Sequence, residues 1–452
     1  MTTHRFLFSL ALAAGVITAP AAEVTVSDDS SSALRSGSLK DQMRDSIRHS
    51  HKVIYIDGKP DRLSQSHIDS IQEIINRYYY DQFESFSDPA APYFLFMSKD
   101  AQLSMGVGGC VRMRGWYEWG GIVPSNALYP YLIPMNPQPG QMRKFGTTPA
   151  GTTLFFKVLG RNRHLGYYQV YIEGSFNGYN NTGFNLKKAY AVLNDWTIGY
   201  ATSTFSDPAS VPPVVDAAGP NNKLSYTSVL VRWMHTMKTR WTVAASLETP
   251  SSHSDIIDGI TGRVADWLPD AAAFMQYAWG ETEHVRLAGI VRTLSYRNVK
   301  EGRNHTLPGW GLQLSATGHP HEAVTLYGNV SGGRGYASLS GDLGIGNYDL
   351  ISDPDMPGKM STPWASGWNV GLQYHFLPSL FASASWSESH YLNHRDTGPD
   401  EYKYGQSLSV NMFWNITPRI QVAMEYDWGR RKNFGGASHS TNRMEMMAQF
   451  SF

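Results

Sequence analysis

The strongest constraint in this sequence is a strict alternation of apolar and polar residues near its end. From Ile420 to Trp428, and again from Met444 to Phe452, almost every second residue is apolar or aromatic, and charged or polar residues stand between them. A period of two places the two sets on opposite faces of a strand. A soluble protein must cover such an apolar face with a second layer, whereas in an outer-membrane barrel that face meets lipid and the polar face lines the interior. The chain also stops on an aromatic residue, as bacterial outer-membrane barrels commonly do.

The same alternation recurs from about residue 101 onward, in about sixteen segments of roughly ten residues each. The segments begin near Leu103, Thr153, Tyr167, Phe184, Trp196, Tyr226, Trp241, Ala272, His284, Gly309, Val324, Trp368, Leu380, Tyr404, Ile420 and Arg443. An even number suits a bacterial barrel whose two ends lie on the same side. We therefore predict an all-β fold, a transmembrane antiparallel β-barrel of about 16 strands over residues 101–452.

The connections between these segments alternate in length. Residues 206–223 and 250–269 are long connections, whereas residues 236–238 and 280–281 are short. Long external loops and short periplasmic turns alternate in this way in outer-membrane barrels, and a two-sheet sandwich has no reason to show the pattern. The alternation predicts an outer-membrane location with both ends of the barrel on the periplasmic side. Outward-facing candidates include Val231, Trp233 and Leu312.

The N-terminal 100 residues precede the predicted barrel. Residues 1–22 have the form of a secretory signal peptide, with a short basic start, an apolar stretch and a small-residue cleavage site. We interpret residues 23–100 as a periplasmic arm, in which apolar residues at helical spacing predict an amphipathic helix at about 66–84. That helix could pair with copies of itself as a coiled coil, plug the barrel mouth or pack against its own chain. After the signal peptide the sequence contains no run of about eighteen apolar residues, so we predict no membrane helix.

The opposite strand parity predicts the residues that face the interior. The pore-lining basic candidates are Arg112, Arg114, Lys157, Lys187, Arg232, Arg240, Arg286 and Arg292. The acidic candidates are Glu118, Glu173, Glu248, Glu425, Asp427 and Glu445. Basic residues therefore crowd the first nine strands, and the densest acidic group lies on the last two. Rings of Arg and Lys favour anions, and the planar guanidinium fits a carboxylate with two hydrogen bonds. The alternative for each basic residue is a salt bridge to an interior acid or a solvated wall charge.

The connection over residues 206–223 is a candidate constriction. In trimeric porins the third external loop commonly folds inward and narrows the pore. Here that loop contains Asp207, Asp216 and the pair Pro212–Pro213, and prolines would stiffen it. An ordinary surface loop is the alternative.

Several segments resemble DcaP-type trimeric outer-membrane porins. The resemblance lies in residues 188–191, 196–199 and 202–207, and in Gly219–Asn221 followed by a strand that contains Arg232. The predicted helical arm is similar to the periplasmic coiled-coil extension of that family. The resemblance implies a homotrimer in the lipid and lipopolysaccharide of a Gram-negative outer membrane. It also implies passive uptake of small anions such as dicarboxylates.

Other kinds of chemistry have little support in the sequence. The net charge is zero, so nothing points to nucleic acid. The single cysteine, Cys110, has no disulfide or CxxC partner. His375 and Ser383 are predicted to face the interior on neighbouring strands, but interior serines more often bind water. We predict no catalytic residues, no cofactor and no metal, although the external Asp353 and Asp355 could bind calcium instead of being merely solvated.

A second function class stays open at this stage. The long external loops, rich in Tyr, Pro and Gly, could serve a surface binding or adhesion protein. A closed barrel would favour adhesion, and an open barrel would favour the diffusion of small hydrophilic solutes.

Overall fold

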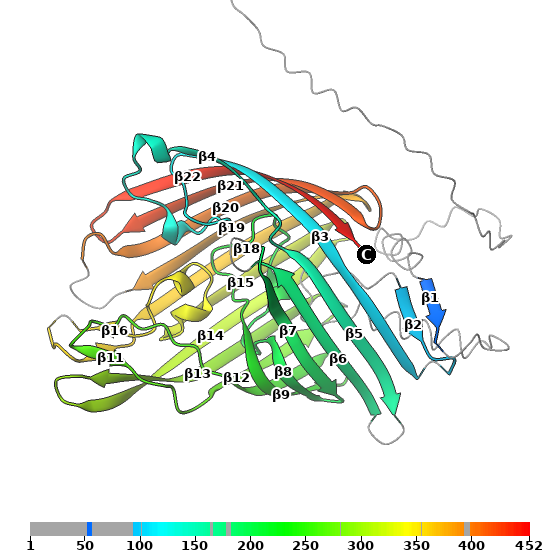
Figure 1. The fold of residues 1–452 in the computed structure, drawn as a ribbon, viewed down its shortest axis with the longest axis horizontal. Coiled ribbons are helices and arrows are strands. Elements are labelled where there is room, and N and C mark those ends of the chain that lie inside the picture. The colour runs from blue at the N-terminus through cyan, green and yellow to red at the C-terminus, as the bar shows by residue number, and fades with distance from the viewer. Residues whose placement is uncertain are drawn as a thin grey trace, which may run out of the picture. The chain divides into compact units, whose positions relative to one another are not determined.

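Sixteen antiparallel strands form a closed barrel in which neighbours in the chain are neighbours in the sheet, and the last strand pairs with the first (Figure 1). This computed structural model describes residues 52–56, 94–100, 102–162, 166–177, 182–280, 282–353, 355–392 and 398–452. The predicted signal peptide and the predicted helix at 66–84 lie outside these residues. Among the residues described, no helix is both long and apolar enough to span a membrane.

The barrel strands have the following bounds. The first half contains β3 (Leu103–Trp119), β4 (Arg143–Thr148), β5 (Thr152–Asn162), β6 (Gly166–Phe176), β7 (Phe184–Leu193), β8 (Trp196–Thr202), β9 (Thr227–Met237), β10 (Trp241–Glu248) and β12 (Asp270–Ala278). The second half contains β13 (His284–Asn298), β14 (Arg303–His321), β15 (Val324–Arg334), β18 (Trp364–Leu377), β19 (Leu380–Leu392), β20 (Tyr402–Asn415), β21 (Ile420–Asn433) and β22 (Ser438–Ser451).

Strands β4 and β5 together form the second strand of the barrel. Strand β3 pairs with β4 over Arg114–Trp119 and with β5 over Leu103–Cys110. The three residues between β4 and β5 include Gly151, whose φ of +95° suits glycine. No predicted segment begins at β4, because its residues RKFGTT lack the apolar alternation that marks the other strands.

Two short strands extend the sheet beside the start of β3. Strand β2 (Phe94–Met97) pairs antiparallel with β3, and β1 (Lys52–Tyr55) pairs parallel with β2. Strand β3 begins at Leu103, but its pairing with β22 begins only at Cys110. Strand β2 therefore occupies the part of the β3 edge that the last barrel strand does not reach.

The two faces of the wall separate as the alternation predicts. On β9, Val231 and Trp233 are 44% and 37% exposed, whereas Arg232 between them is 4% exposed. On β14, Leu312 and Leu314 are exposed and Gln313 is buried. The outer face is thus apolar and the inner face polar, as expected for a barrel in lipid.

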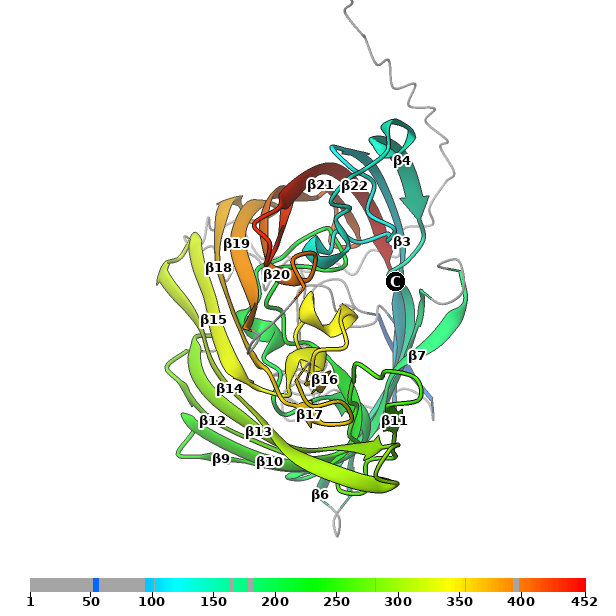
Figure 2. The same cartoon turned by 90° about the vertical axis from the view of Figure 1, so that its left-hand side faces the viewer.

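Three long connections fold into the barrel, so the main core lies between them and the inner wall. They are residues 120–142, 203–226 and 335–363. They carry the short turns η1 (Pro130–Leu132), η2 (Pro139–Gln141), η4 (Pro208–Ser210), η5 (Ala337–Leu339) and η6 (Leu343–Ile345) and the hairpin of β16 (Ile351–Ser352) and β17 (Met360–Ser361). Figure 2 shows the yellow turns η5 and η6 inside the ring of strands. The largest buried cluster joins Phe205, Tyr336 and Leu343 of these loops to Tyr391 and Tyr402 of the wall. Outside the barrel ladder, β11 (Thr261–Arg263) pairs with the far end of β13.

Candidate functional site

The connection over residues 203–226, here called the crossing loop, passes through the barrel interior from one wall to the other. It leaves β8, contacts β13 and β14, reaches β21 and β22 on the opposite wall, and returns to β9. Three points of contact hold it: its base at Asp207, its middle at Pro213 and its tip at Asp216. Each point involves inward-facing side chains of the wall.

The base of the crossing loop is held by Asp207, which is fully buried. Its carboxylate lies 2.9 Å from Nε2 of His284 and 3.4 Å from a guanidinium nitrogen of Arg286, and it accepts a hydrogen bond from Ser315. Burial by itself would raise the pKa of Asp207, but Arg286 and the hydrogen bonds from His284 and Ser315 hold that pKa well below its usual range. Asp207 is therefore a carboxylate throughout the physiological pH range.

The middle of the crossing loop lies against β18, β19 and β20. The carbonyl oxygen of Pro213 accepts hydrogen bonds from Ser383 Oγ at 2.6 Å and from Asn411 Nδ2 at 2.9 Å. On β18, a Cβ atom built at Gly371 would lie 2.5 Å from Cγ of Pro212. The missing side chain at Gly371 therefore makes the room that the proline ring occupies.

The tip of the crossing loop binds the carboxylate of Glu425 through its backbone. The amide groups of Val215 and Asp216 donate to the two oxygens of Glu425 at 2.7 and 2.6 Å. The Asp216 side chain pairs with Arg443 at 3.0 Å and accepts from the amide of Leu128, which belongs to the inward connection 120–142. Burial would raise the pKa of Asp216, but Arg443 and Arg114 lower it overall.

Two arginines of the wall share the acidic groups around this tip. Arg443 lies 3.4 Å from Glu118 and 3.3 Å from Glu445, and Arg114 lies 3.1 Å from Glu445. Arg114 also donates to the carbonyl of Val215. All of these side chains are buried. The tip is thus held by a network that joins the first and last strands of the barrel.

Other arginines that were predicted to face the interior also form ion pairs with inward-folding loops. Arg292 pairs with Asp270 at 3.0 Å and with Asp349 of the connection 335–363 at 3.3 Å. Arg292 and Arg286 are almost completely buried. For Arg114, Arg286 and Arg292 the structure therefore shows the salt-bridge alternative that the sequence left open.

A second acidic group, Asp342, joins the connections 335–363 and 120–142. It accepts hydrogen bonds from the amide of Tyr131 at 2.7 Å and from the hydroxyl of Tyr402. Burial raises the pKa of Asp342 to about 6, although these hydrogen bonds and Arg431 oppose the rise. Asp342 thus titrates just below neutral pH.

The remaining predicted basic residues have different surroundings. Arg112, Lys157 and Arg232 have inward parity on β3, β5 and β9, and Arg112 is partly exposed, with Nε 2.7 Å from Gln449. Lys187 is 30% exposed and pairs with the buried Glu173 at 2.8 Å. Arg240, in contrast, is exposed in the short turn after β9, where it donates to Tyr277. Arg112 and Lys187 are therefore partly exposed, whereas Lys157 and Arg232 are buried.

Sequence reasoning missed several residues of the loop anchors. Arg443 shares the inward face of β22 with Glu445 but is absent from the predicted pore-lining set. His284 has the same parity as Arg286 and could have been found in the same way. Asp342 and Asp349 lie in a loop, where no periodic signal marks them. Strand parity thus identifies the anchoring residues on the barrel wall but not their partners in the loops.

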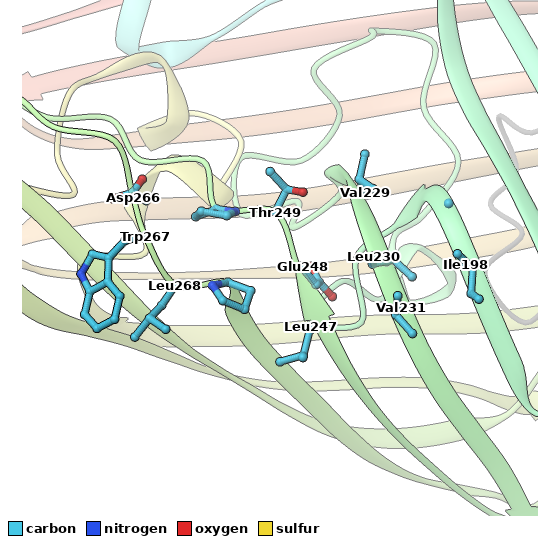
Figure 3. A pocket seen from close by; sticks show the side chains of 13 residues that line it. Ile198, Val229, Leu230, Val231, Leu247, Glu248, Thr249, Asp266, Trp267 and Leu268 are labelled. Carbon is cyan, nitrogen blue, oxygen red and sulfur yellow. The ribbon is translucent and has the colours of Figure 1, made fainter.

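A pocket of about 340 Å³ lies elsewhere, on the outer face of the barrel (Figure 3). It is lined by apolar residues of β8, β9 and β10 and by residues 266–269 of the following loop, including Trp267, which is 68% exposed. Ile198 and Leu247 line this pocket from outward-facing positions of the wall.

Comparisons with known proteins agree on the architecture. The model of a family described as DcaP outer membrane protein matches residues 156–452. The crystal structure of the outer membrane channel DcaP of Acinetobacter baumannii superposes with a TM-score of 0.67 at 19% identity, covering 79% of this chain and 99% of that one. The anion-selective porin from Comamonas acidovorans superposes with a TM-score of 0.53 at 10% identity, covering 77% of this chain and 100% of that one. No curated protein sequence matches significantly.

Proposed function

Because the chain belongs to the DcaP outer membrane protein family, we propose that it is a diffusion channel for small hydrophilic solutes that favours small anions such as dicarboxylates. Its family and fold are those of outer-membrane channels, not of enzymes. One structural neighbour, the Comamonas acidovorans protein, is an anion-selective porin, which supports the proposed preference. The solute does not react; it is selected by size and charge during passage.

The observation that carries the proposal is the distribution of charge on the inner wall. On β21 and β22, Glu425 accepts hydrogen bonds from backbone amides of the loop tip, and Glu445 pairs with Arg114 and Arg443. On β3 to β9, basic residues of inward parity outnumber acidic ones; they include Arg112, Lys157, Lys187 and Arg232. Such a wall lowers the energy of an anion and raises that of a cation in the passage. Asp207 and Asp216, in turn, hold the crossing loop that narrows this passage.

Assembly and orientation are part of the same proposal. Strand β8 has only 7 residues, whereas a strand needs about 9–11 residues to cross a bilayer. A low wall of this kind is suited to contact with another protomer, which supports a homotrimer. We place both ends of the barrel in the periplasm, residues 1–22 as a signal peptide, and residues 23–100 as a periplasmic arm.

The test is the reversal potential of the purified channel in a planar bilayer under a salt gradient. We expect anion selectivity in the wild type. In Arg112→Gln plus Lys187→Gln, the anion-to-cation permeability ratio should fall by roughly five- to sixfold per charge. A unit charge at about 8 Å in water lowers the energy of the anion and raises that of the cation by about 0.5 kcal/mol each, so the difference between them changes by about 1 kcal/mol. The matched control is Arg297→Gln plus Arg303→Gln, which removes two exposed charges from the tip of the β13–β14 hairpin.

The control pair should keep the wild-type ratio. A cation-selective wild type would contradict the proposed preference and would point to the acidic residues of β21 and β22. A folded barrel without conductance would instead favour the surface-binding alternative.

A further inference from the structure

A compact group of buried carboxylates lies where the tip of the crossing loop meets the wall. Asp216 of the loop, Asp427 of β21 and Glu445 of β22 each present a carboxylate oxygen, and these oxygens lie within 4.8 Å of one another. All three residues are buried. Three carboxylates converge here from three separate segments of the chain, so their mutual repulsion must be balanced locally.

Arginines balance only part of this charge. Arg443 pairs with Asp216 and Glu445, and Arg114 pairs with Glu445. Glu118 and Glu425 lie in the same network, so among the described residues around the loop tip buried carboxylates outnumber buried guanidinium groups. Burying an unbalanced charge is costly, and either protons or a bound cation must compensate the excess.

Asp427 supplies a second, independent observation. Asp427 is 3% exposed, and its Oδ1 accepts a hydrogen bond from Ser409 of β20 at 2.5 Å. Its other oxygen, Oδ2, is fully buried and has no hydrogen-bond partner among the described residues. In the ladder, Asp427 stands between Ser409 on one side and Arg443 of β22 on the other. Because Oδ1 of Asp427 already accepts the hydrogen bond from Ser409, Oδ2 is the oxygen that remains to face Asp216 and Glu445. A buried carboxylate oxygen without a donor is rare in proteins and indicates a missing partner.

We propose that Asp216, Asp427 and Glu445 bind one hard divalent cation, Ca²⁺, which fastens the tip of the crossing loop to the wall. Carboxylate oxygens are the ligands of Ca²⁺ and Mg²⁺, and the group contains neither the histidine nor the cysteine that softer metals prefer. Two oxygens that bind one Ca²⁺ at about 2.3–2.6 Å can stand up to about 5 Å apart, so the three carboxylates are close enough to share one ion. This site differs from the sequence expectation, which named no metal in the interior.

The inference does not depend on the proposed transport. One ligand comes from the loop and two come from the wall, so the cation links the loop to the wall. This link does not depend on which solute passes. Binding can be measured at equilibrium without ion flow. A failure of this proposal therefore leaves the selectivity experiment untouched, and the reverse also holds.

The first test is calorimetric titration of Ca²⁺ into the full-length folded protein after chelator treatment and dialysis. We expect one saturable site per chain with a Kd on the order of 0.1–1 mM, as in extracellular Ca²⁺ sites. Asp427→Asn should weaken binding by at least roughly tenfold. Asp195→Asn is the matched control, because Asp195 is a half-exposed residue of the short turn between β7 and β8.

A second measurement avoids dependence on the folding of the Asp427→Asn variant. The indole ring of Trp116 lies 5.3 Å from the guanidinium of Arg443, beside the proposed site. Tb³⁺, which replaces Ca²⁺ at oxygen sites, emits when a nearby tryptophan is excited. Emission should fall in Trp116→Phe, should persist in Trp267→Phe, and should be displaced by Ca²⁺.

Three results would each overturn the proposal. One is the lack of saturable Ca²⁺ binding to the wild type at concentrations roughly tenfold above the expected range, which would mean that protons balance the carboxylates. The second is full Ca²⁺ affinity in a folded Asp427→Asn variant, and the third is Tb³⁺ emission that is unchanged in Trp116→Phe. Either of the last two would place the cation elsewhere.

Discussion

Arginine residues have two different roles in this barrel, and burial separates them. Arg286, Arg292 and Arg443 are enclosed and pair with carboxylates that belong to inward loops. Arg112 is partly exposed on the inner wall. Removing one partner of a buried ion pair leaves the other charge uncompensated, whereas removing an exposed charge changes mainly the local potential. The first group should therefore govern loop position, and the second should govern the energy of a passing ion.

At the residue scale, Arg286→Ala should loosen the base of the crossing loop. The substitution leaves the Asp207 carboxylate buried without its guanidinium partner, at a cost of about 3–5 kcal/mol. We expect single-channel current to become noisier and more variable between channels, because the loop samples several positions. Single-channel recording measures this effect. Arg303→Ala, at the exposed tip of a hairpin, should leave the current as quiet as in the wild type; equal noise in both variants would refute the anchoring role.

A second residue-scale prediction concerns pH. The pKa of Asp342 is raised to about 6 inside the folded protein, above the 3.8 expected for an unburied carboxyl. Because the folded state binds the proton more tightly, the loop contacts are most stable below the unburied value and weaken as pH rises through about 6. Between pH 5 and pH 7.5 the opening equilibrium of residues 335–353 should increase roughly tenfold.

Hydrogen exchange, corrected for its intrinsic pH dependence, measures this opening. Asp342→Asn should remove the pH difference, because the amide does not titrate. Asp258→Asn, an exposed substitution in another loop, should retain it. A pH effect that persists in Asp342→Asn would assign the titration to a different group.

At the element scale, glycines of the inner wall define where the loops rest. A Cβ atom at Gly371 would lie 2.5 Å from Pro212, and one at Gly367 would lie 2.4 Å from Asn222, so both positions lack space for a side chain. Gly371→Val should push the crossing loop off β18 at a cost of about 1–3 kcal/mol. We expect a changed single-channel conductance in a barrel that still folds.

The matched control for this element is Gly328→Val on the neighbouring strand. A Cβ atom there meets nothing closer than 3.8 Å. Conductance should match the wild type in this variant. If Gly371→Val also conducts as the wild type does, the loop must rest elsewhere than on Gly371.

The elements themselves were predicted from the sequence to very different degrees. Most strand starts lie within about two residues of the predicted ones, because lipid on one side and water or loop on the other impose period two on the chain. The starts of β14, β18 and β22 came earlier than predicted, at Arg303, Trp364 and Ser438. The early parts of β14 and β22 are mainly polar, and the early part of β18 includes the small residues Ala365, Ser366 and Gly367, so the alternation fades there.

The candidate site was less predictable for a related reason. Parity placed Arg286 and Glu425 inside the barrel, but their partners Asp207 and Asp216 lie on a loop whose path no periodic pattern describes. Whether an interior charge lines the passage or anchors a loop depends on contacts between residues about 80 and 210 positions apart. Those contacts arise only when the whole wall is in place.

At the scale of the whole molecule, the wall is uneven in height. Strand β14 has 19 residues and β8 has 7. If the low side of the barrel meets other protomers, a charge on its outer face should disturb assembly. Ile198→Lys, at an outward position of β8, should lower the fraction of trimer on unheated gels, with a cost of about 2–4 kcal/mol.

Leu314→Lys provides the comparison on the high side of the barrel, where the outer face meets lipid. We expect this variant to reduce the yield of folded barrel while the folded fraction remains trimeric. Similar loss of trimer in both variants would argue against the low wall as the contact between protomers.

The contacts of the crossing loop also set an order of events during biogenesis. The loop is synthesised before the middle of the chain, yet its tip binds Glu425 and Arg443, close to the last residue. An incomplete barrel that lacks β21 and β22 therefore lacks two of the groups that hold the tip, although Arg114 and the amide of Leu128 are present. The interior reaches its final shape only when the terminal hairpin inserts and seals against β3. We therefore expect a chain truncated before β21 to keep the base and middle contacts of the crossing loop and to lose the contacts of its tip with Glu425 and Arg443.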